Sequence, residues 1–105
     1  MHIKINELAR YLISFIKKEL ISTAGYQEME KPHWVYDGSN GNSKNGLLQS
    51  YGLGMHLARG TKETNDCVFR VGELAIGHMG RDYGLASSMY FDAHGVGVVC
   101  AINGA

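Results

Sequence analysis

The fold is decided by residues 77–92, which have the sequence Gly77-His78-Met79-Gly80-Arg81-Asp82-Tyr83-Gly84-Leu85-Ala86-Ser87-Ser88-Met89-Tyr90-Phe91-Asp92. The stretch predicts the end of one strand, a tight passage, a second strand over residues 85–91 and the start of a hairpin turn at residues 92–95. Residues 96–103 then predict the returning strand. Because this last pair carries apolar or small residues on both faces, we expect both sides of it to be covered.

The segment before this stretch supplies the remaining strands. From Tyr51 to Leu57, apolar residues alternate with glycine and histidine, which is the period of a strand. Residues 67–71 and 74–78 predict one further strand with a bend at Gly72. The sequence therefore predicts an antiparallel sheet of about three or four strands.

The N-terminal third predicts two helices. Over residues 6–20, apolar side chains recur at helical spacing, so we expect an amphipathic helix that packs on one face of the sheet. Asn6 is a candidate N-cap for this helix. A second, shorter helix would start at Ser22 or Thr23 and stop ahead of Pro32.

These elements indicate an α+β fold with one partial domain over residues 1–105. It would consist of a helical lead-in (1–34), a glycine- and asparagine-rich loop (35–50) and the antiparallel sheet (51–105). The first helix would cover one face of the sheet. The other face would need a cover that the chain does not clearly supply.

Composition excludes several classes of function. Hydrophobic residues make up 45% of the chain, and ten basic residues balance ten acidic ones, so neither a nucleic acid nor an anionic membrane surface is an expected partner. No segment has the length and apolar character of a membrane span, and the N-terminus lacks the pattern of a signal peptide. Cys67 and Cys100 are expected to be two buried thiols, with a disulfide between them as the less favoured alternative. No set of His, Cys, Asp or Glu residues has metal-ligand spacing, so we predict no metal and no cofactor.

Four short motifs follow one another along the chain: Lys31-Pro32-His33-Trp34, Tyr51-Gly52-Leu53-Gly54, Gly77-His78-Met79-Gly80 and Asn103-Gly104. Their order resembles the C-terminal portion of the serine beta-lactamase and penicillin-binding-protein family, closest to its class C beta-lactamase, esterase and D-aminopeptidase branch. The resemblance covers almost the whole chain and implies a partial beta-lactamase/transpeptidase-like fold. Members of this family are commonly periplasmic or secreted, whereas the sequence itself does not define a compartment.

The resemblance implies site residues at the His-x-Gly triplet. In the family, the residue at the position of His78 helps to bind a substrate carboxylate or supports proton transfer, which makes His78 the candidate catalytic residue. Gly80 would let a substrate approach the backbone, and the N–H of Arg81 would supply half of an oxyanion hole. Met79 stands where the family usually has a small hydroxyl residue. Taken alone, a histidine beside glycines also fits a structural or merely exposed role.

The family's nucleophile, a serine in a Ser-x-x-Lys motif, has no convincing counterpart. Ser14 and Lys17 have the right spacing, but Ser14 falls in the middle of the first predicted helix, on its polar face. We therefore predict a C-terminal fragment, or a truncated relative, of a serine hydrolase that acts on a lactam, amide or ester and is inactive alone. Its partners would be the missing N-terminal part of the parent domain and a small acyl substrate.

Two alternatives are a non-catalytic module, which belongs to another class, and a small enzyme. The chain could be a small non-catalytic module that covers its open sheet by pairing with a second copy of itself, because an exposed strand edge and a bare apolar face favour association. It could also be an active small enzyme that uses Ser14 and Lys17. The exposure of Ser14 and its distance from His78 discriminate between these hypotheses.

Overall fold

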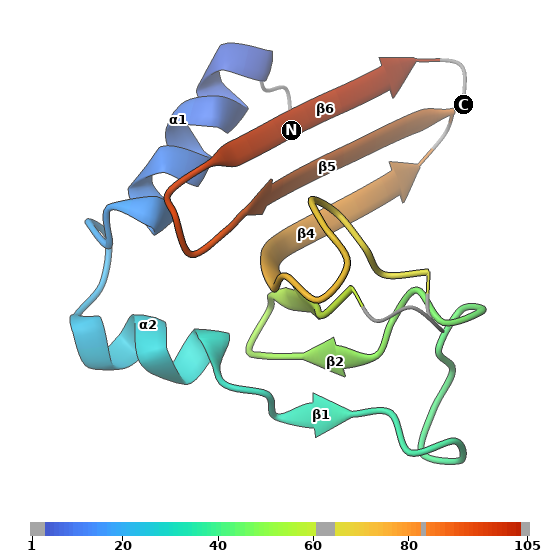
Figure 1. Ribbon diagram of the computed structural model, residues 1–105. Coiled ribbons are helices and arrows are strands. Elements are labelled where there is room, and N and C mark those ends of the chain that lie inside the picture. Colours follow the sequence, from blue (N-terminus) through green and yellow to red (C-terminus); the bar gives the residue numbers. More distant parts are fainter. Residues whose placement is uncertain (1–3, 61–64, 83, 104–105) are drawn as a thin grey trace.

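The computed structural model describes residues 4–60, 65–82 and 84–103. These residues form two helices and one antiparallel sheet of six strands (Figure 1). The helices are α1 (Ile5–Ile16) and α2 (Thr23–Glu30), and the strands are β1 (Trp34–Val35), β2 (Ser50–Tyr51), β3 (His56–Ala58), β4 (Ala75–Asp82), β5 (Leu85–Phe91) and β6 (Gly97–Asn103). The order of the strands in the sheet is their order in the sequence, so each strand pairs with its neighbours along the chain.

The α+β class is confirmed, but the sheet has six strands rather than three or four. The alternating segment from Tyr51 onward is a tight hairpin, in which Tyr51 on β2 pairs with His56 on β3. The Gly52 N–H donates to the Met55 carbonyl at 2.8 Å and closes the turn. A side chain at Gly52 would overlap the carbonyl oxygen of Met29, so the contact with the end of α2 requires glycine there.

Two other boundaries differ from the prediction. The segment 65–74 is irregular, and β4 begins only at Ala75. The predicted loop over residues 35–50 is bordered by two short strands, because β1 pairs with β2 through Trp34–Tyr51 and Val35–Ser50. In contrast, β5 and the hairpin turn that follows it lie where the sequence predicts them.

Helix α1 is shorter than predicted and has a different cap. It starts after Lys4, whose backbone N–H donates to the Glu7 carboxylate at 3.2 Å, so the prediction of Asn6 as the N-cap was wrong. It ends at Ile16 because the chain turns at Lys18, which has a φ of +57°. The ammonium of Lys18 pairs with the carboxylate of Glu30 at the end of α2 and thereby ties the two helices together.

Helix α2 confirms the prediction made from its capping residues. The Ser22 side chain accepts a hydrogen bond from the Gly25 N–H at 3.1 Å. The helix ends at Glu30, and Lys31 is extended ahead of Pro32. Neither described helix is long and apolar enough to cross a membrane.

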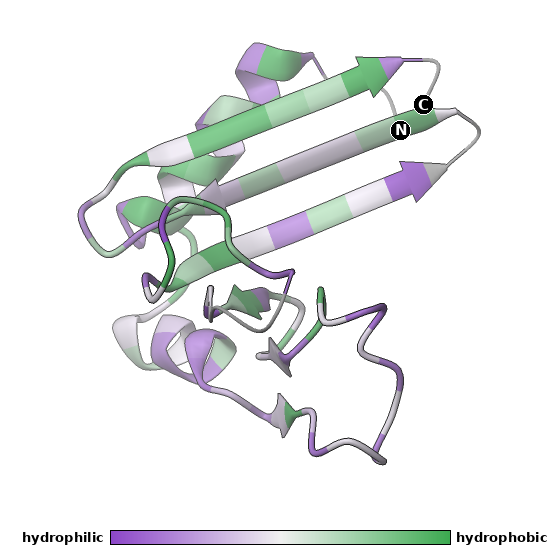
Figure 2. Ribbon diagram, turned by 45° about the vertical axis from the view of Figure 1, so that its right-hand side comes forward, coloured by the Kyte–Doolittle hydropathy of each residue, from purple (hydrophilic) through white to green (hydrophobic). Residues whose placement is uncertain are grey.

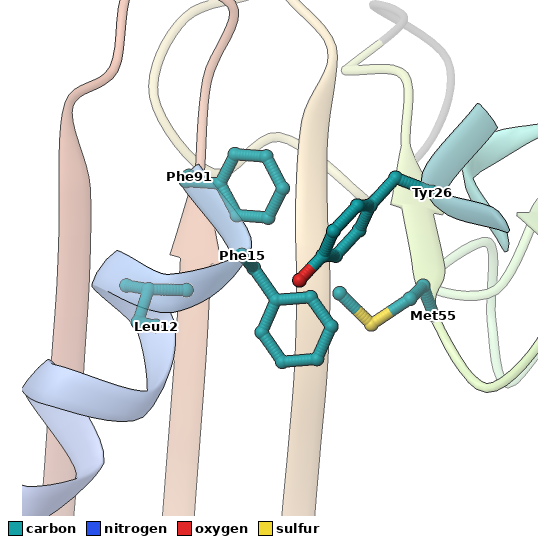
Figure 3. Packing of buried hydrophobic residues seen from close by; sticks show 5 residues of the cluster. All are labelled: Leu12, Phe15, Tyr26, Met55 and Phe91. Atoms are coloured by element: carbon teal, nitrogen blue, oxygen red, sulfur yellow. The ribbon is translucent and has the colours of Figure 1, made fainter. Parts of the chain in front are cut away.

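Helix α1 covers one face of β5 and β6, as the sequence predicts. We call this face of the sheet the helix side. The main core lies between the helix side and the two helices, and its buried members are shown in Figure 3: Leu12, Phe15, Tyr26, Met55 and Phe91. The rings of Phe15 and Tyr26 meet edge-on with centroids 5.9 Å apart, so the core also joins α1 to α2.

The opposite face, which we call the open side, is covered over only part of its width. Val68 and Phe69 pack over a second cluster around Tyr90. Beyond them, Val98 and Ile102 on β6 are 42% and 54% exposed, and Figure 2 shows the apolar residues of this strand. The expectation that the last strand pair is covered on both sides was therefore wrong.

Both cysteines are exposed, which contradicts the expectation of buried thiols. Cys67 lies in the irregular segment 65–74 rather than in a strand. Cys100 lies on the open side of β6, next to residues that no described segment covers. The strand-like sequence around each cysteine led to the prediction of burial, but such a pattern does not show whether another segment packs over the residue.

Gly77 is the position on β4 that should tolerate a side chain least. A Cβ atom at this position would overlap the carbonyl oxygen of Met89 on β5. We expect Gly77→Ala to lower the free energy of unfolding by at least about 2 kcal/mol, because backbone atoms must shift to relieve the overlap. Urea denaturation monitored by circular dichroism measures this loss.

Gly80→Ala is the matched control on the same strand. Its Cβ would lie 3.3 Å from Oγ of Ser87, the end of a small side chain that can rotate away. Equal stability losses for the two variants would contradict the assigned packing of β4 against β5.

Candidate functional site

Strand β4 carries all three predicted site residues. His78 pairs with Met89, Gly80 with Ser87 and Arg81 with Ala86 on β5. Because side chains alternate along a strand, His78 and Gly80 belong to the helix side and Arg81 to the open side. All three residues are exposed.

The edge of β4 becomes open at His78. Strand β3 pairs with β4 only at residues 75–77. From residue 78 to residue 82, no described residue pairs with β4 on the side away from β5, and Figure 1 shows β4 running on past the short strands. An open edge of this kind presents N–H and C=O groups to which an extended ligand can bind.

Four aromatic and imidazole rings gather where this edge opens. Tyr51 stacks on His56 with ring centroids 5.8 Å apart and meets His78 edge-on at 6.5 Å. His56 in turn meets Tyr90 edge-on at 5.7 Å. We call these four residues the ring cluster. It combines residues from β2, β3, β4 and β5.

The inner half of the ring cluster is held by a buried hydrogen bond. Nδ1 of His56 lies 2.7 Å from Oη of Tyr90, and these side chains belong to residues that are 1% and 4% exposed. The two residues sit on either side of Gly77, which is paired with His56 on one flank and with Tyr90 on the other. Since Gly77 has no side chain, the two rings can meet across the middle strand.

Burial keeps His56 and Tyr90, the two inner rings of the cluster, neutral. It lowers the pKa of His56 below its usual value, and the nearby charge of His78 acts in the same direction, while the Leu47 backbone and the Asp66 carboxylate oppose the shift. Burial and the neighbouring Tyr51 raise the pKa of the Tyr90 phenol far above its usual value. His56 and Tyr90 therefore form a hydrogen bond between two uncharged groups.

The outer half of the ring cluster consists of Tyr51 and His78, which lie edge-on to one another beside the open edge. Desolvation raises the pKa of the half-buried Tyr51, so its phenol keeps its proton at neutral pH. A protonated phenol donates one hydrogen bond, and the imidazole of His78 can donate or accept. These groups suit the binding of a carbonyl or carboxylate, but neither is a strong nucleophile.

Ser14 and Lys17 lack the arrangement of a nucleophile and its base. Ser14 is in the last turn of α1, and its Oγ donates to the carbonyl oxygen of Tyr11 at 2.5 Å. Lys17 is the exposed C-cap residue of the same helix. In the Ser-x-x-Lys motif of the family, the serine begins a buried helix. Ser14 instead lies near the end of α1.

Sequence reasoning missed Tyr51, His56 and Tyr90. It placed His56 on a strand and assigned it no role. The only signal in the sequence was the presence of large rings near glycines, which does not identify partners 34 positions apart, such as His56 and Tyr90. Pairing of the residues across β4 brings them together.

No protein-family model matches the chain, and no curated protein and no solved structure matches it either. The link to serine hydrolases therefore rests on the short motifs of the sequence. Within the described ranges, no three His, Cys, Asp or Glu side chains lie close enough together to hold a metal ion.

The hydrogen bond between His56 and Tyr90 should stabilise the fold. We expect Tyr90→Phe to lower the free energy of unfolding by about 1–3 kcal/mol, because Nδ1 of His56 loses its partner inside the protein. Tyr11→Phe removes a phenol from an exposed position and should change the stability little. Equal effects in urea denaturation would show that the bond contributes nothing specific.

The lowered pKa of His56 predicts a pH dependence of stability. An unfolded histidine takes up its proton near pH 6.5, whereas folded His56 does so only at lower pH. The unfolded state then binds more protons, so the free energy of unfolding should fall as the pH drops below about 6.5 and be fully present above it. Urea denaturation from about pH 8 to about pH 5 measures the slope.

His56→Gln removes the titrating group, keeps an acceptor for Tyr90 and should flatten this slope. His94→Gln is the control, because His94 is exposed in the hairpin turn. If His56→Gln and the wild type gave parallel pH curves, His56 would not be the group that titrates.

Proposed function

We propose that this chain binds small acyl compounds, namely lactams, amides or esters, along the open edge of β4. The chain would act as part of a serine hydrolase that resembles class C beta-lactamases, and it would not be catalytic alone. The observation that carries the proposal is the exposure of His78 at the point where β3 ends and the edge of β4 opens.

The open edge offers what an acyl group needs. A carbonyl oxygen is bound best by backbone N–H groups that are fixed in place, and a strand edge fixes them. Gly80 lies two residues into the open part of β4, where the lack of a side chain lets a ligand approach the backbone. Arg81, the proposed oxyanion donor of the resemblance, follows it directly.

The ring cluster would orient the rest of the ligand. Tyr51 and His78 lie edge-on to one another beside the open edge, and the pair can bind a carboxylate or a second carbonyl. Tyr51 stacks on His56, and the buried hydrogen bond between His56 and Tyr90 holds His56 in place. This support would hold the two outer rings in place before a ligand binds, which reduces the entropy that binding costs.

The chemical step would require a serine that this chain does not offer in a suitable place. In the parent reaction, a serine attacks the carbonyl and the C–N or C–O bond of the substrate breaks, so that its amine or alcohol leaves (in a lactam, the ring opens) and an acyl-enzyme forms. Water then hydrolyses this acyl-enzyme and restores the serine. Ser14 hydrogen-bonds to its own helix instead. The attacking serine and its base would therefore come from the missing N-terminal part of the parent domain.

Binding can be tested separately from chemistry. In a titration with benzylpenicillin followed by two-dimensional ¹H–¹⁵N NMR, we expect shifts concentrated at Tyr51 and at residues 78–81. His78→Ala should weaken the binding several-fold, whereas His94→Ala, at an exposed turn position, should leave it unchanged. A titration without shifts at residues 78–81 would refute the proposed acyl site.

Covalent labelling tests whether the chain has a nucleophile. A fluorescent penicillin and a fluorophosphonate probe should leave both the wild type and Ser14→Ala unlabelled. An adduct that forms on the wild type and disappears in Ser14→Ala would make Ser14 a true nucleophile and overturn the proposal of an inactive chain.

A further inference from the structure

We propose that two copies of this chain associate through β6, so that their sheets join into one continuous antiparallel sheet. Strand β6 has seven residues and forms one edge of the sheet. The other edge is β1, which has only two residues. A long edge strand is a template for a further strand, and short edges are one way in which proteins avoid such pairing.

Strand β6 lacks the other features that protect an edge. Its sequence, Gly-Val-Val-Cys-Ala-Ile-Asn, contains no charged residue and no proline. It pairs with β5 in unbroken register over all seven positions, without a bulge that would twist the edge away. Charged side chains, proline and bulges are the usual devices against edge pairing, and β6 has none of them.

Apolar side chains flank the edge on both faces. On the open side, Val98 and Ile102 are about half exposed. On the helix side, α1 packs on the start of β6, where Leu12 and Ile16 lie against Gly97. Ile13 is a neighbour of Ile16 on the helix surface and is also exposed. A partner strand would therefore bury apolar surface above and below its backbone hydrogen bonds.

A second copy of the chain fits this edge better than a charged partner does. Cys100 is the central residue of β6, so full antiparallel pairing of the strand with itself places Cys100 opposite Cys100 of the second copy. Val98 then faces Ile102 of the second copy, and Val99 faces Ala101, so every inner pair is apolar or small. The chain also has no net charge, so two copies do not repel one another.

This interface is separate from the acyl site proposed above. Strand β5 lies between β6 and β4, and the open edge of β4 faces away from β5. Pairing through β6 therefore leaves His78 accessible in both copies, and the two proposals can fail independently.

Sedimentation velocity over a range of concentrations tests the association. We expect a dimer in the wild type, and at least about tenfold weaker association for Val98→Lys, because the lysine would lie unpaired in the apolar interface. Val35→Lys is the matched control, since Val35 is a 51% exposed valine on the opposite edge strand. A wild type that stays monomeric, or equal effects of the two variants, would overturn the proposal.

The register has its own test. The double variant Val98→Lys, Ile102→Glu sets opposite charges across the two-fold axis and should recover association lost in Val98→Lys alone. In parallel, a short bis-maleimide should link two copies of Cys67→Ser but not two copies of Cys100→Ser, since both cysteines are exposed. This register would be ruled out if the reagent linked copies of Cys100→Ser but not of Cys67→Ser. It would also be ruled out if the double variant associated no better than Val98→Lys.

Discussion

The hydrogen bond between His56 and Tyr90 is the interaction on which the arrangement of this sheet depends. It spans three strands, because His56 on β3 and Tyr90 on β5 meet across Gly77 of β4. Both partners are buried and uncharged, so neither can exchange this bond for water without opening the sheet. The absence of a side chain at Gly77 makes the contact possible. The same absence lets the backbones of β4 and β5 approach closely near Met89.

The candidate site begins one residue beyond this crossing. At His78 the partner strand β3 has ended, and the edge of β4 is open. Residues 76–77 of β4 pair with strands on both sides, whereas among the described strands only β5 pairs with residues 78–82. Tyr51 connects the two parts, because it stacks on buried His56 and meets exposed His78. A rigid support next to an open strand edge is what precise positioning of a small ligand requires.

Coverage of the sheet by other elements is uneven, and the exposed regions are where interactions are expected. Helix α1 covers the helix side of β5 and β6, and Val68 and Phe69 cover part of the open side. No described strand pairs with β6 on the side away from β5, and exposed valine and isoleucine lie beside this edge. The acyl site proposed from the resemblance to serine hydrolases uses the β4 edge, whereas the proposed pairing of two copies rests on the β6 edge alone.

The sequence by itself determined the α+β class, the cap and the end of α2, and the final hairpin, because these depend on residues close to one another in the chain. Side-chain periodicity, Ser22 as a cap and the turn at Asp92 act over a few residues only. It did not determine the hairpin between β2 and β3, the exposure of Cys100 or the ring cluster. Only the tertiary structure decided those features, since they depend on contacts between distant segments: Gly52 against Met29, the partial cover over the open side, and the pairing across Gly77.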